Sequence, residues 1–371
     1  MHVCGLLSKG GRNMEEKSKG KVTAIDLGKR RSYFVIDDGN GNTVREGYTP
    51  TDRQGFNDFL CDVEEGSTVI VEASNSLDRV AELLKGYELV VAHPAKVRLI
   101  AASVKKTDKN DAHTLLELYR LGYLPRSYLA DAETRQKRNL CRNRDFFVRQ
   151  RTAVKSRIKD QAYRKGVDIK RYSQVWMEVL RSLHDPVIDM LVGQLADFNR
   201  LIKEADRQIE EAYKTDKYAQ LIDTIPGFGK YASLAVSAQI GDVSRFKDED
   251  KLCAYAGLVP ITRQSGGYEW KGRTRKGDSF LKFLVVECTH TFLRCCPDSL
   301  IGQAHKSIAL RAGRWKAQIA SSRKVLRTIY YMLKRGETYH LYEERRKTSA
   351  DDLLHCSYRM RDASPRSNVK A

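Results

Sequence analysis

The sequence of 371 residues contains no run of about 18 consecutive apolar residues, the length that a helix needs to span a bilayer. Residues 1–20 include basic side chains but lack the apolar core of a secretory signal peptide. No internal repeat is evident. These absences argue against a membrane protein, a secreted protein and a repeat array, and they predict a cytoplasmic protein.

Cysteine forms no regular framework either. The eight cysteines lie at positions 4, 61, 141, 253, 288, 295, 296 and 356 without a CxxC pair, so reduced thiols are expected rather than disulfides. Cys288, His290, Cys295 and Cys296 make up one cluster of zinc-ligand residue types. On a helix, however, Cys288 and His290 point to different faces, and we therefore predict no zinc site.

Acidic residues are in deficit. The 47 Asp and Glu stand against 66 Lys and Arg, which gives a formal net charge of +19. This excess goes beyond what solubility requires and attracts a polyanion over long range. Hydrophobic residues make up 41% of the chain, enough for folded cores, and the length exceeds what one core usually organises. We therefore expect a nucleic-acid-binding, nucleoid-associated protein of at least two domains.

Residues 21 to 122 have the hydrophobic pattern of an α/β domain. Short runs rich in β-branched residues alternate with segments of helical periodicity. Strands are expected at 22–28, 31–38, 43–48, 67–74 and 87–93, and helices at 56–63, 77–84, 94–104 and 108–122. Three strands followed by helix, strand, helix, strand and helix is the order of an RNase H-like fold.

The next segment is predicted to be an unusually basic helix. Between Arg135 and Lys165, twelve Lys and Arg stand against Asp145 and Asp160 alone, while apolar residues recur at helical spacing. A solvated helix face would explain the pattern. However, so many positive side chains on one helix repel one another unless an anion lies against them, which favours contact with phosphate. The expected contacts are Arg142, Arg149, Lys155 and Arg157. A helix at 187–213 is the expected antiparallel partner in a helical hairpin or coiled coil.

A second candidate for phosphate contact is the turn in LIDTIPGFGKYASLAVSAQIG. Helix, Pro-Gly-x-Gly turn and helix together resemble a helix-hairpin-helix element. In such a turn Gly227 and Gly229 let backbone N–H groups approach phosphate oxygens, and Lys230 adds a charge. An ordinary tight turn between helices is the alternative, and the sequence leaves both open.

Beyond residue 253 the sequence is rich in glycine and basic residues, and it is expected to form a loop region flanked by helices. Ser265 lies there beside Gly266 and Gly267, and by composition alone it is an ordinary turn serine. The basic residues around it that are expected to bind nucleic acid are Arg263, Lys271, Arg273, Arg275 and Lys276. A last helix is predicted at 317–333, and a poorly ordered polar tail after about residue 342.

Four carboxylates are the candidates for metal chemistry. Asp26 lies toward the end of the first predicted strand and Glu72 toward the end of the fourth, while Asp108 and Asp111 lie at i and i+3 on one helical face. Strands one and four are neighbours in an RNase H-like sheet, so the four side chains are expected at one edge, where their repulsion calls for a cation. Hard oxygen ligands suit Mg²⁺ or Mn²⁺, which support phosphoryl transfer. For any single acidic residue an N-cap or a surface charge is the alternative.

Several motifs together resemble a known family. They are AIDLGK around Asp26, VEAS around Glu72, HPAKVRLIA with KTDKNDAH, IPGFGKYASLAVSAQIGDVSRF, LCAYAGLVPITRQSGG with Ser265, GRTRKG, and RKVLRTIYYMLKRGETY. In this order, over residues 21 to about 340, the sequence resembles the DEDD-type insertion-sequence transposases, also called bridge-RNA-guided recombinases. The Piv-type DNA invertases are similar.

The resemblance implies roles for particular residues. Asp26, Glu72, Asp108 and Asp111 would form the metal-binding tetrad of a RuvC-like domain, and Ser265 would be the nucleophile that forms a phosphoserine ester with DNA. The metal site would activate Ser265 in a composite active site. The expected partners are the DNA of the element ends and target, a structured noncoding RNA, and further copies of the chain in a dimer or tetramer.

The predicted organisation is α/β plus α. We expect a flexible extension at 1–20, a RuvC-like domain at 21–130, a basic helical linker at 131–215, a mainly helical transposase domain with the serine at 216–345, and a polar tail at 346–371. Met14 is an alternative start. Two other functions stay open: a hydrolytic RuvC-like nuclease that uses the carboxylates without the serine, and a nucleic-acid-binding protein without catalysis.

Overall fold

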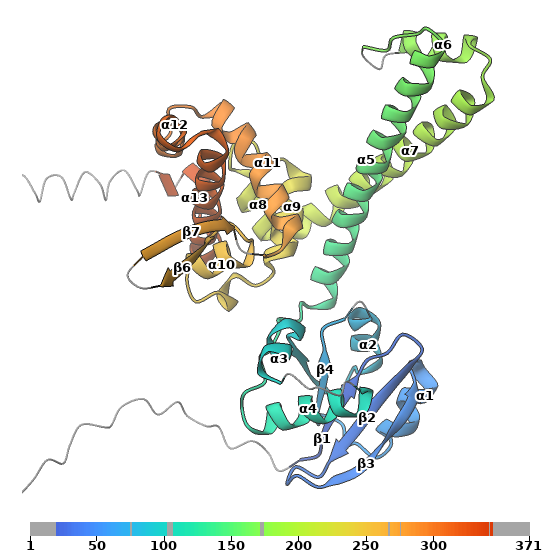
Figure 1. Ribbon diagram of the computed structural model, residues 1–371, viewed down its shortest axis with the longest axis vertical. Helices are drawn as coiled ribbons and strands as arrows, with labels where there is room; N and C mark the ends of the chain where they lie inside the picture. The colour runs from blue at the N-terminus through green and yellow to red at the C-terminus, as the bar shows by residue number, and fades with distance from the viewer. Residues whose placement is uncertain are drawn as a thin grey trace, which may run out of the picture. The chain divides into compact units, whose positions relative to one another are not determined.

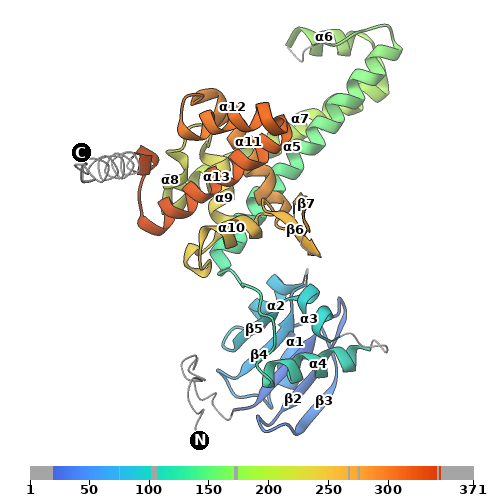
Figure 2. The ribbon, with the colours of Figure 1, turned by 60° about the vertical axis from the view of Figure 1, so that its left-hand side comes forward.

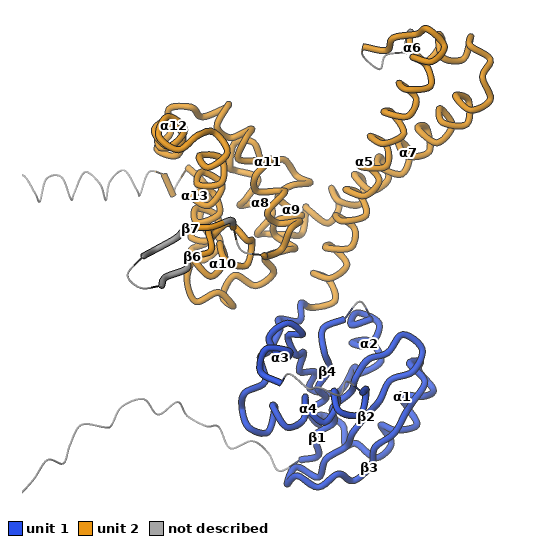
Figure 3. Tube along the Cα trace, viewed as in Figure 1, with its two compact units in different colours: residues 1–130 blue, residues 131–371 orange. Residues whose placement is uncertain are grey.

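The computed structural model describes residues 20–74, 76–101, 107–170, 174–265, 268–274, 276–340 and 342–343. The side chains of residues 174–175, 262–265, 268–271 and 273 lie outside the description as well. The chain divides into two compact units, residues 1–130 (unit 1) and 131–371 (unit 2), which Figure 3 distinguishes by colour. No helix in the described part of the chain is long and apolar enough to cross a membrane.

Unit 1 is built on a five-stranded mixed sheet in the order β3-β2-β1-β4-β5 (Figure 1). Its strands are β1 (Val22–Asp26), β2 (Arg31–Asp37), β3 (Thr43–Pro50), β4 (Thr68–Glu72) and β5 (Glu88–Ala92). The first three strands form an antiparallel meander, and β4 and β5 run parallel to β1. All five predicted strands are confirmed to within a few residues.

Helices cover both faces of this sheet because side chains alternate along each strand. Those such as Ile25, Phe34 and Val69 pack with the helices α1 (Arg53–Leu60) and α2 (Leu77–Leu83). Those such as Ala24 and Ile70 pack with α4 (Asp108–Arg120). The helix α3 (Pro94–Ile100) adds the partly buried Val97 to the same core. A slip of one residue would turn both sets to the wrong face, so the two cores fix the register of the strands.

The helix α4 runs antiparallel to β1 and β4. Near its last turn Tyr119 donates its hydroxyl to Thr68 Oγ1 at 3.5 Å, at the beginning of β4. The neighbouring Arg120 Nη1 lies 3.7 Å from Oδ2 of Asp37, which pairs with Val22 at the beginning of β1. The first turn of α4 therefore points toward the edge of the sheet where β1 and β4 end.

Unit 2 contains two long antiparallel helices, α5 (Ala132–Arg164) and α7 (Pro186–Thr215), with α6 (Gln174–Ser182) beside their far end (Figures 1 and 2). Buried residues such as Ile158 of α5 and Ile188 of α7 form a separate core at that end. The predicted basic helix and its antiparallel partner are confirmed, because the apolar stripe on each helix packs against the other.

The rest of unit 2 is mainly helical and has one large core. Its helices are α8 (Lys217–Asp223), α9 (Lys230–Ile240), the short η1 (Val243–Arg245), α10 (Glu249–Tyr255), α11 (Ser279–Cys295), α12 (Leu300–Ala312) and α13 (Arg314–Arg335). Leu234 of α9, Phe292 of α11 and Ile329 of α13 meet in this core and are fully buried. The predicted last helix is confirmed as α13, three residues longer at its start and two at its end.

One sequence prediction is wrong in part. The Gly-rich basic region, predicted as loop, contains the strands β6 (Pro260–Ser265) and β7 (Tyr268–Thr274), which form a two-stranded antiparallel sheet, here called the serine hairpin. Two glycines between two short runs are the sequence signal of a hairpin turn, and the basic composition obscures it. The helices predicted to flank this region are present as α10 and α11, whereas α6 and α12 were not predicted. The predicted flexible extension and the tail from residue 346 lie outside the described residues.

Candidate metal centre and nucleic-acid interface

Asp26 and Glu72 are side by side at the end of two neighbouring parallel strands. Ile25 of β1 aligns with Val71 of β4, so the next residues, Asp26 and Glu72, lie at the same level. Both are half-buried, because helices cover the two faces of the sheet up to this edge. Parallel strands end together, and the sequence therefore brings two carboxylates to one place through the register of its buried runs.

Asp108 and Asp111 lie in the first turn of α4, at the same edge. From Tyr119 back to Asp111 the helix advances about 12 Å. From Thr68, beside Tyr119, to Glu72 the strand advances about 13 Å in the same direction. Thr107 caps the helix, since its Oγ1 accepts from the N–H of Asn110 at 3.2 Å. We call Asp26, Glu72 and this first turn the carboxylate edge.

Glu46 of β3 fixes the start of α4 to the sheet, a contact that the sequence analysis missed. Lys109 donates a hydrogen bond to Glu46 Oε1, and His113 Nε2 lies 2.6 Å from Glu46 Oε2. The hydrogen bond from Lys109, followed by that from His113, holds the pKa of the Glu46 carboxyl below its ordinary value. Lys109 and His113 are four residues apart and share one helix face, which is the only signal the sequence offers.

The donor set at this edge fits a hard divalent ion. Mg²⁺ is commonly held by one or two carboxylates while it keeps several waters and binds substrate phosphate, so the pair Asp26 and Glu72 meets its minimum. Among the described residues, no group of three or more His, Cys, Asp or Glu lies close enough to hold a metal ion. The gathering of all four predicted carboxylates around metal therefore stays a prediction.

His93 is a further polar residue at this edge. It directly follows Ala92 of β5, which pairs with Glu72 in the neighbouring strand. Its Nδ1 is buried and has no hydrogen-bond partner in the described part of the chain. A buried imidazole nitrogen normally has a partner, so this atom is a candidate for contact with a ligand. The sequence analysis quoted His93 within a motif but gave it no role.

Ser265 is the last residue of β6 and pairs with Tyr268 of β7. Its side chain lies outside the described residues, as do those of the predicted nucleic-acid contacts Arg263, Lys271, Arg273 and Arg275. Lys276 is exposed directly after the hairpin.

The base of the serine hairpin is fixed tightly to α10. A Cβ at Gly277 would lie 2.4 Å from the backbone N of Gly257 and 2.5 Å from the carbonyl oxygen of Tyr255. Lys282 Nζ also donates to Thr274 Oγ1 at 2.7 Å. Glycine is therefore required at position 277, and no local pattern around this residue predicts that packing.

The Pro-Gly-x-Gly turn joins α8 and α9 as predicted, but its two glycines differ. Gly227 has a φ of +92°, and a Cβ there would lie 2.7 Å from the backbone N of Phe292 in α11. Close helix packing thus accounts for Gly227. At Gly229, the N-cap of α9, an added Cβ would meet no described atom within 4 Å, so this helix end is open. Lys230 pairs with Glu210 at 2.5 Å.

The basic helix α5 uses part of its charge inside the protein. Arg142 donates to Gln239 Oε1 at 2.7 Å and lies 3.5 Å from Asp278. The other predicted contacts lie further along the helix. Arg149 and Arg157 have side chains 63% and 61% exposed and form ion pairs with Asp145 and Asp160 of α5 itself, while Lys155 is half-buried. The distal half of α5 is therefore the accessible half.

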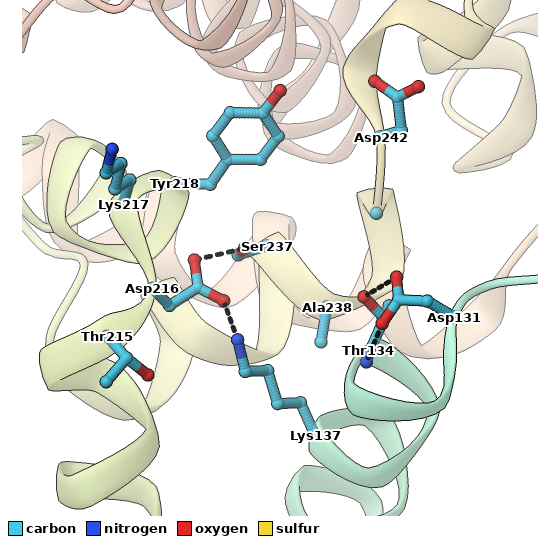
Figure 4. Close-up of a pocket in the computed structure, with 11 residues that line it drawn as sticks. Asp131, Thr134, Lys137, Thr215, Asp216, Lys217, Tyr218, Ser237, Ala238 and Asp242 are labelled. Atoms are coloured by element: carbon cyan, nitrogen blue, oxygen red, sulfur yellow. Dashed lines mark hydrogen bonds and ion pairs between the residues drawn. The ribbon is translucent and has the colours of Figure 1, made fainter.

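A polar cavity of about 340 Å³ lies where α5, α8 and α9 meet (Figure 4). Asp216 accepts from Lys137 Nζ and from Ser237 Oγ, both at 2.8 Å, and also caps α8. None of the predicted site residues lines this cavity. Its polar side chains bond to one another and to helix ends, so they hold the three helices together.

Two family models match the chain in sequence order. A DEDD transposase model of the IS110 type, described as "Transposase", matches residues 23–162. A second, described as "Transposase IS116/IS110/IS902 family", matches residues 219–301. The first covers the carboxylate edge and α5, and the second covers the Pro-Gly-x-Gly turn and the serine hairpin.

Three relatives carry the names of insertion-element proteins, and two of these names say transposase. The transposase for insertion sequence element IS1111A of Coxiella burnetii is 25% identical over 248 residues, 63% of this chain and 68% of that protein. The transposase for insertion sequence element IS1328 of Yersinia enterocolitica is 24% identical over 74% of this chain and 84% of its own length. A 44.8 kDa protein of insertion element IS116 of Streptomyces clavuligerus is 35% identical over 30% of this chain and 28% of its own length.

Proposed function

This chain belongs to the DEDD-type insertion-sequence transposases, and on that premise we propose that it cuts and rejoins DNA strands through a serine ester, with divalent metal at the carboxylate edge. Family membership makes the protein a metal-dependent DNA transposase. Three points belong to the proposal: which metal ion binds, which residue is the nucleophile, and which RNA guides the protein.

The observation that carries the proposal is the carboxylate edge itself. The strand order β3-β2-β1-β4-β5, with β1 between an antiparallel and a parallel neighbour, supports an RNase H-like, RuvC-like fold for unit 1. Asp26 and Glu72 end the two central parallel strands, and the first turn of α4 reaches the same level. The two carboxylates offer hard oxygen ligands at one half-buried place, which supports the binding of a divalent metal ion.

Mg²⁺ or Mn²⁺ at this edge would neutralise the phosphate and lower the pKa of an attacking hydroxyl. Asp26, Glu72, Asp108 and Asp111 are the residues that would hold it. Nδ1 of His93, which has no hydrogen-bond partner among the described residues, follows the strand next to Glu72 and would pass the proton of the attacking hydroxyl on to the leaving 3′-oxygen.

In the cutting step, the Oγ of Ser265 attacks the scissile phosphorus. A bond forms between Oγ and phosphorus, the bond to the 3′-oxygen breaks, and the serine proton ends on that oxygen as a free 3′-hydroxyl. In the joining step the 3′-hydroxyl of another strand attacks the same phosphorus and releases serine. Because one ester bond is kept throughout, the strands rejoin without ATP.

The remaining partners follow from charge. Arg149 and Arg157 on the accessible half of α5 suit contacts with the phosphates of a folded RNA or of DNA, which are made through shape rather than base edges. We propose that a structured noncoding RNA supplies sequence recognition. We also propose that a dimer or tetramer of the chain holds the DNA ends together.

Trapping of a covalent intermediate tests the serine. Purified protein, Mg²⁺, guide RNA and DNA of the element end should give a protein–DNA adduct that survives denaturation, and Ser265→Ala should lose it. Ser307→Ala, an exposed serine of α12, is the matched control and should keep the adduct. If Ser265→Ala still cuts DNA cleanly, the chain is a hydrolytic nuclease that uses the carboxylates alone, and the serine ester is excluded.

A further inference from the structure

An apolar groove of about 300 Å³ lies between α11 and α13 in unit 2. Phe283 and Val286 line it from α11, and Trp315 and Ile319 from α13. Trp315 is 88% exposed and Phe283 is 41% exposed, although both are large aromatic side chains. Aromatic rings gathered in an open groove usually mark a binding surface, because their burial by a ligand is strongly favourable.

Positive charge surrounds the groove. Arg314 and Lys316 are exposed on either side of Trp315 in the sequence, and the first turn of α13 contains no acidic residue. The guanidinium carbon of Arg149 lies 5.4 Å from the ring centroid of Phe283. Glu287, one turn beyond Phe283 on α11, is an acidic residue near this face. The surroundings therefore suit an anionic partner with an apolar, planar part.

The groove adjoins the base of the serine hairpin. Lys282, which lines the groove, donates its hydrogen bond to Thr274, the last residue of β7. Ser265 lies on the partner strand of the same hairpin but at its other end, because Thr274 pairs with Pro260 and Ser265 pairs with Tyr268. The strand advances about 17 Å from Pro260 to Ser265, so a DNA strand that is cut at Ser265 and follows the hairpin would bring nucleotides a few positions from the cut to the groove.

We propose that the groove binds an unpaired base of the DNA strand that is being exchanged, with the base stacked on Trp315. This inference rests on the proposed function, which brings DNA to the serine hairpin. Proteins hold single strands by stacking bases on aromatic rings while basic side chains contact the backbone. A base inside a duplex cannot reach such a groove, so binding favours opened DNA next to the cut.

A second copy of the chain is a less suitable occupant. It would bring its own Arg and Lys residues, within a chain of net charge +19, against the positive border of the groove. Like charges brought together at an interface oppose association. A polyanion removes this repulsion, which is why the charge favours DNA.

Binding of DNA with and without unpaired bases tests the proposal. The probes are a duplex with a short bulge, the same duplex with abasic residues in the bulge, and a fully paired duplex. In a Ser265→Ala background, which prevents cutting by the serine, Trp315→Ala should weaken binding of the bulged duplex by about 5- to 150-fold and leave the abasic duplex unchanged. Trp315→Phe keeps a ring and should retain most of the affinity.

Leu310→Ala is the matched control, because Leu310 is also exposed, at 91%, but does not line the groove. It should bind all three duplexes as the background does. An equal loss for bulged and abasic DNA would overturn base stacking. A larger loss for single-stranded RNA than for DNA, or a loss of self-association in sedimentation, would assign the groove to RNA or to a second copy and also overturn it.

The two proposals fail in different ways. If Trp315→Ala weakens binding of the bulged duplex as expected but the otherwise unchanged chain forms no adduct at Ser265, the serine proposal is wrong and the groove proposal is supported. If the adduct forms but Trp315→Ala binds bulged DNA normally, the groove proposal fails and the serine chemistry stands.

Discussion

The carboxylate edge and the serine hairpin are held by different means. Asp26 ends the central strand of a five-stranded sheet whose neighbours fix it on both sides. Ser265 belongs to a two-stranded sheet that is anchored at its base through Gly277 and Thr274. Two-stranded sheets are marginal alone, whereas a covered five-stranded sheet fixes its strand ends. The comparison indicates that the proposed metal site has a preformed frame, while the position of the proposed nucleophile depends on how its hairpin is anchored.

The largest effect is expected from the carboxylate edge. Asp26→Asn or Glu72→Gln should each lower DNA cleavage by about 10²- to 10³-fold, because each removes charge that holds the metal against the developing negative charge on the phosphate. The double variant should be little worse than either single one, since the two carboxylates act as a unit. Single-turnover cleavage with Mg²⁺ measures both.

Asp58→Asn is the matched control for these variants. Asp58 is exposed near the end of α1, on the side of the sheet where β1 begins, since Lys21 donates to the carbonyl oxygen of Asp62 there, and its replacement should leave cleavage within about threefold of the unchanged chain. Additive losses from Asp26→Asn and Glu72→Gln would mean that the two side chains do not share one metal site.

The next effect concerns the Pro-Gly-x-Gly turn between α8 and α9, which packs on α11. Gly227→Ala forces a Cβ against the backbone of α11 at a positive φ and should lower the free energy of unfolding by about 2–4 kcal/mol. Gly229→Ala, two residues on, meets open space and should cost less than about 1 kcal/mol. Urea unfolding measures both variants, and equal losses would contradict the packing of this turn.

A smaller effect separates the two halves of α5. Arg149→Ala and Arg157→Ala should each reduce the slope of log affinity against log salt concentration by about 1, because each removes one phosphate contact. Arg142→Ala, whose side chain is bonded to Gln239, should leave the slope unchanged and instead lower stability. Titrations of RNA and DNA at several salt concentrations measure the slope, and an equal change for Arg142→Ala would remove the distinction.

The smallest effect concerns the contact that fixes α4. The pKa of Glu46 is held below its ordinary value by Lys109 and His113, so its stabilisation is complete above the unfolded pKa of about 4.5 and is lost as the pH falls through the lower folded value. Glu46→Gln should therefore destabilise the protein by up to about 1 kcal/mol at neutral pH, and by progressively less as the pH falls below 4.5. Urea unfolding at pH 7 and pH 3 measures this difference, and a loss that is independent of pH would contradict the ion pair.

Much of unit 1 can be predicted from the sequence because buried parallel strands carry strong apolar runs, such as those before Asp26 and Glu72. The contact of Glu46 with His113 could not be predicted, because it joins residues far apart in the chain on a half-exposed face. In unit 2 the glycine pattern predicts the turn at 225–229 but not that Gly227 packs on α11. The serine hairpin was missed because basic residues interrupt the alternation of its strands.

The most direct test of the central claim is to locate the DNA on the protein. After reaction with Mg²⁺ and DNA of the element end, tryptic digestion and mass spectrometry should find a nucleotide on the peptide of residues 264–271, at Ser265. The modification should be absent when Asp26 is replaced by Asn, because both regions act in one reaction. A nucleotide on another residue, or a Ser265 adduct that forms equally well in Asp26→Asn, would contradict the account.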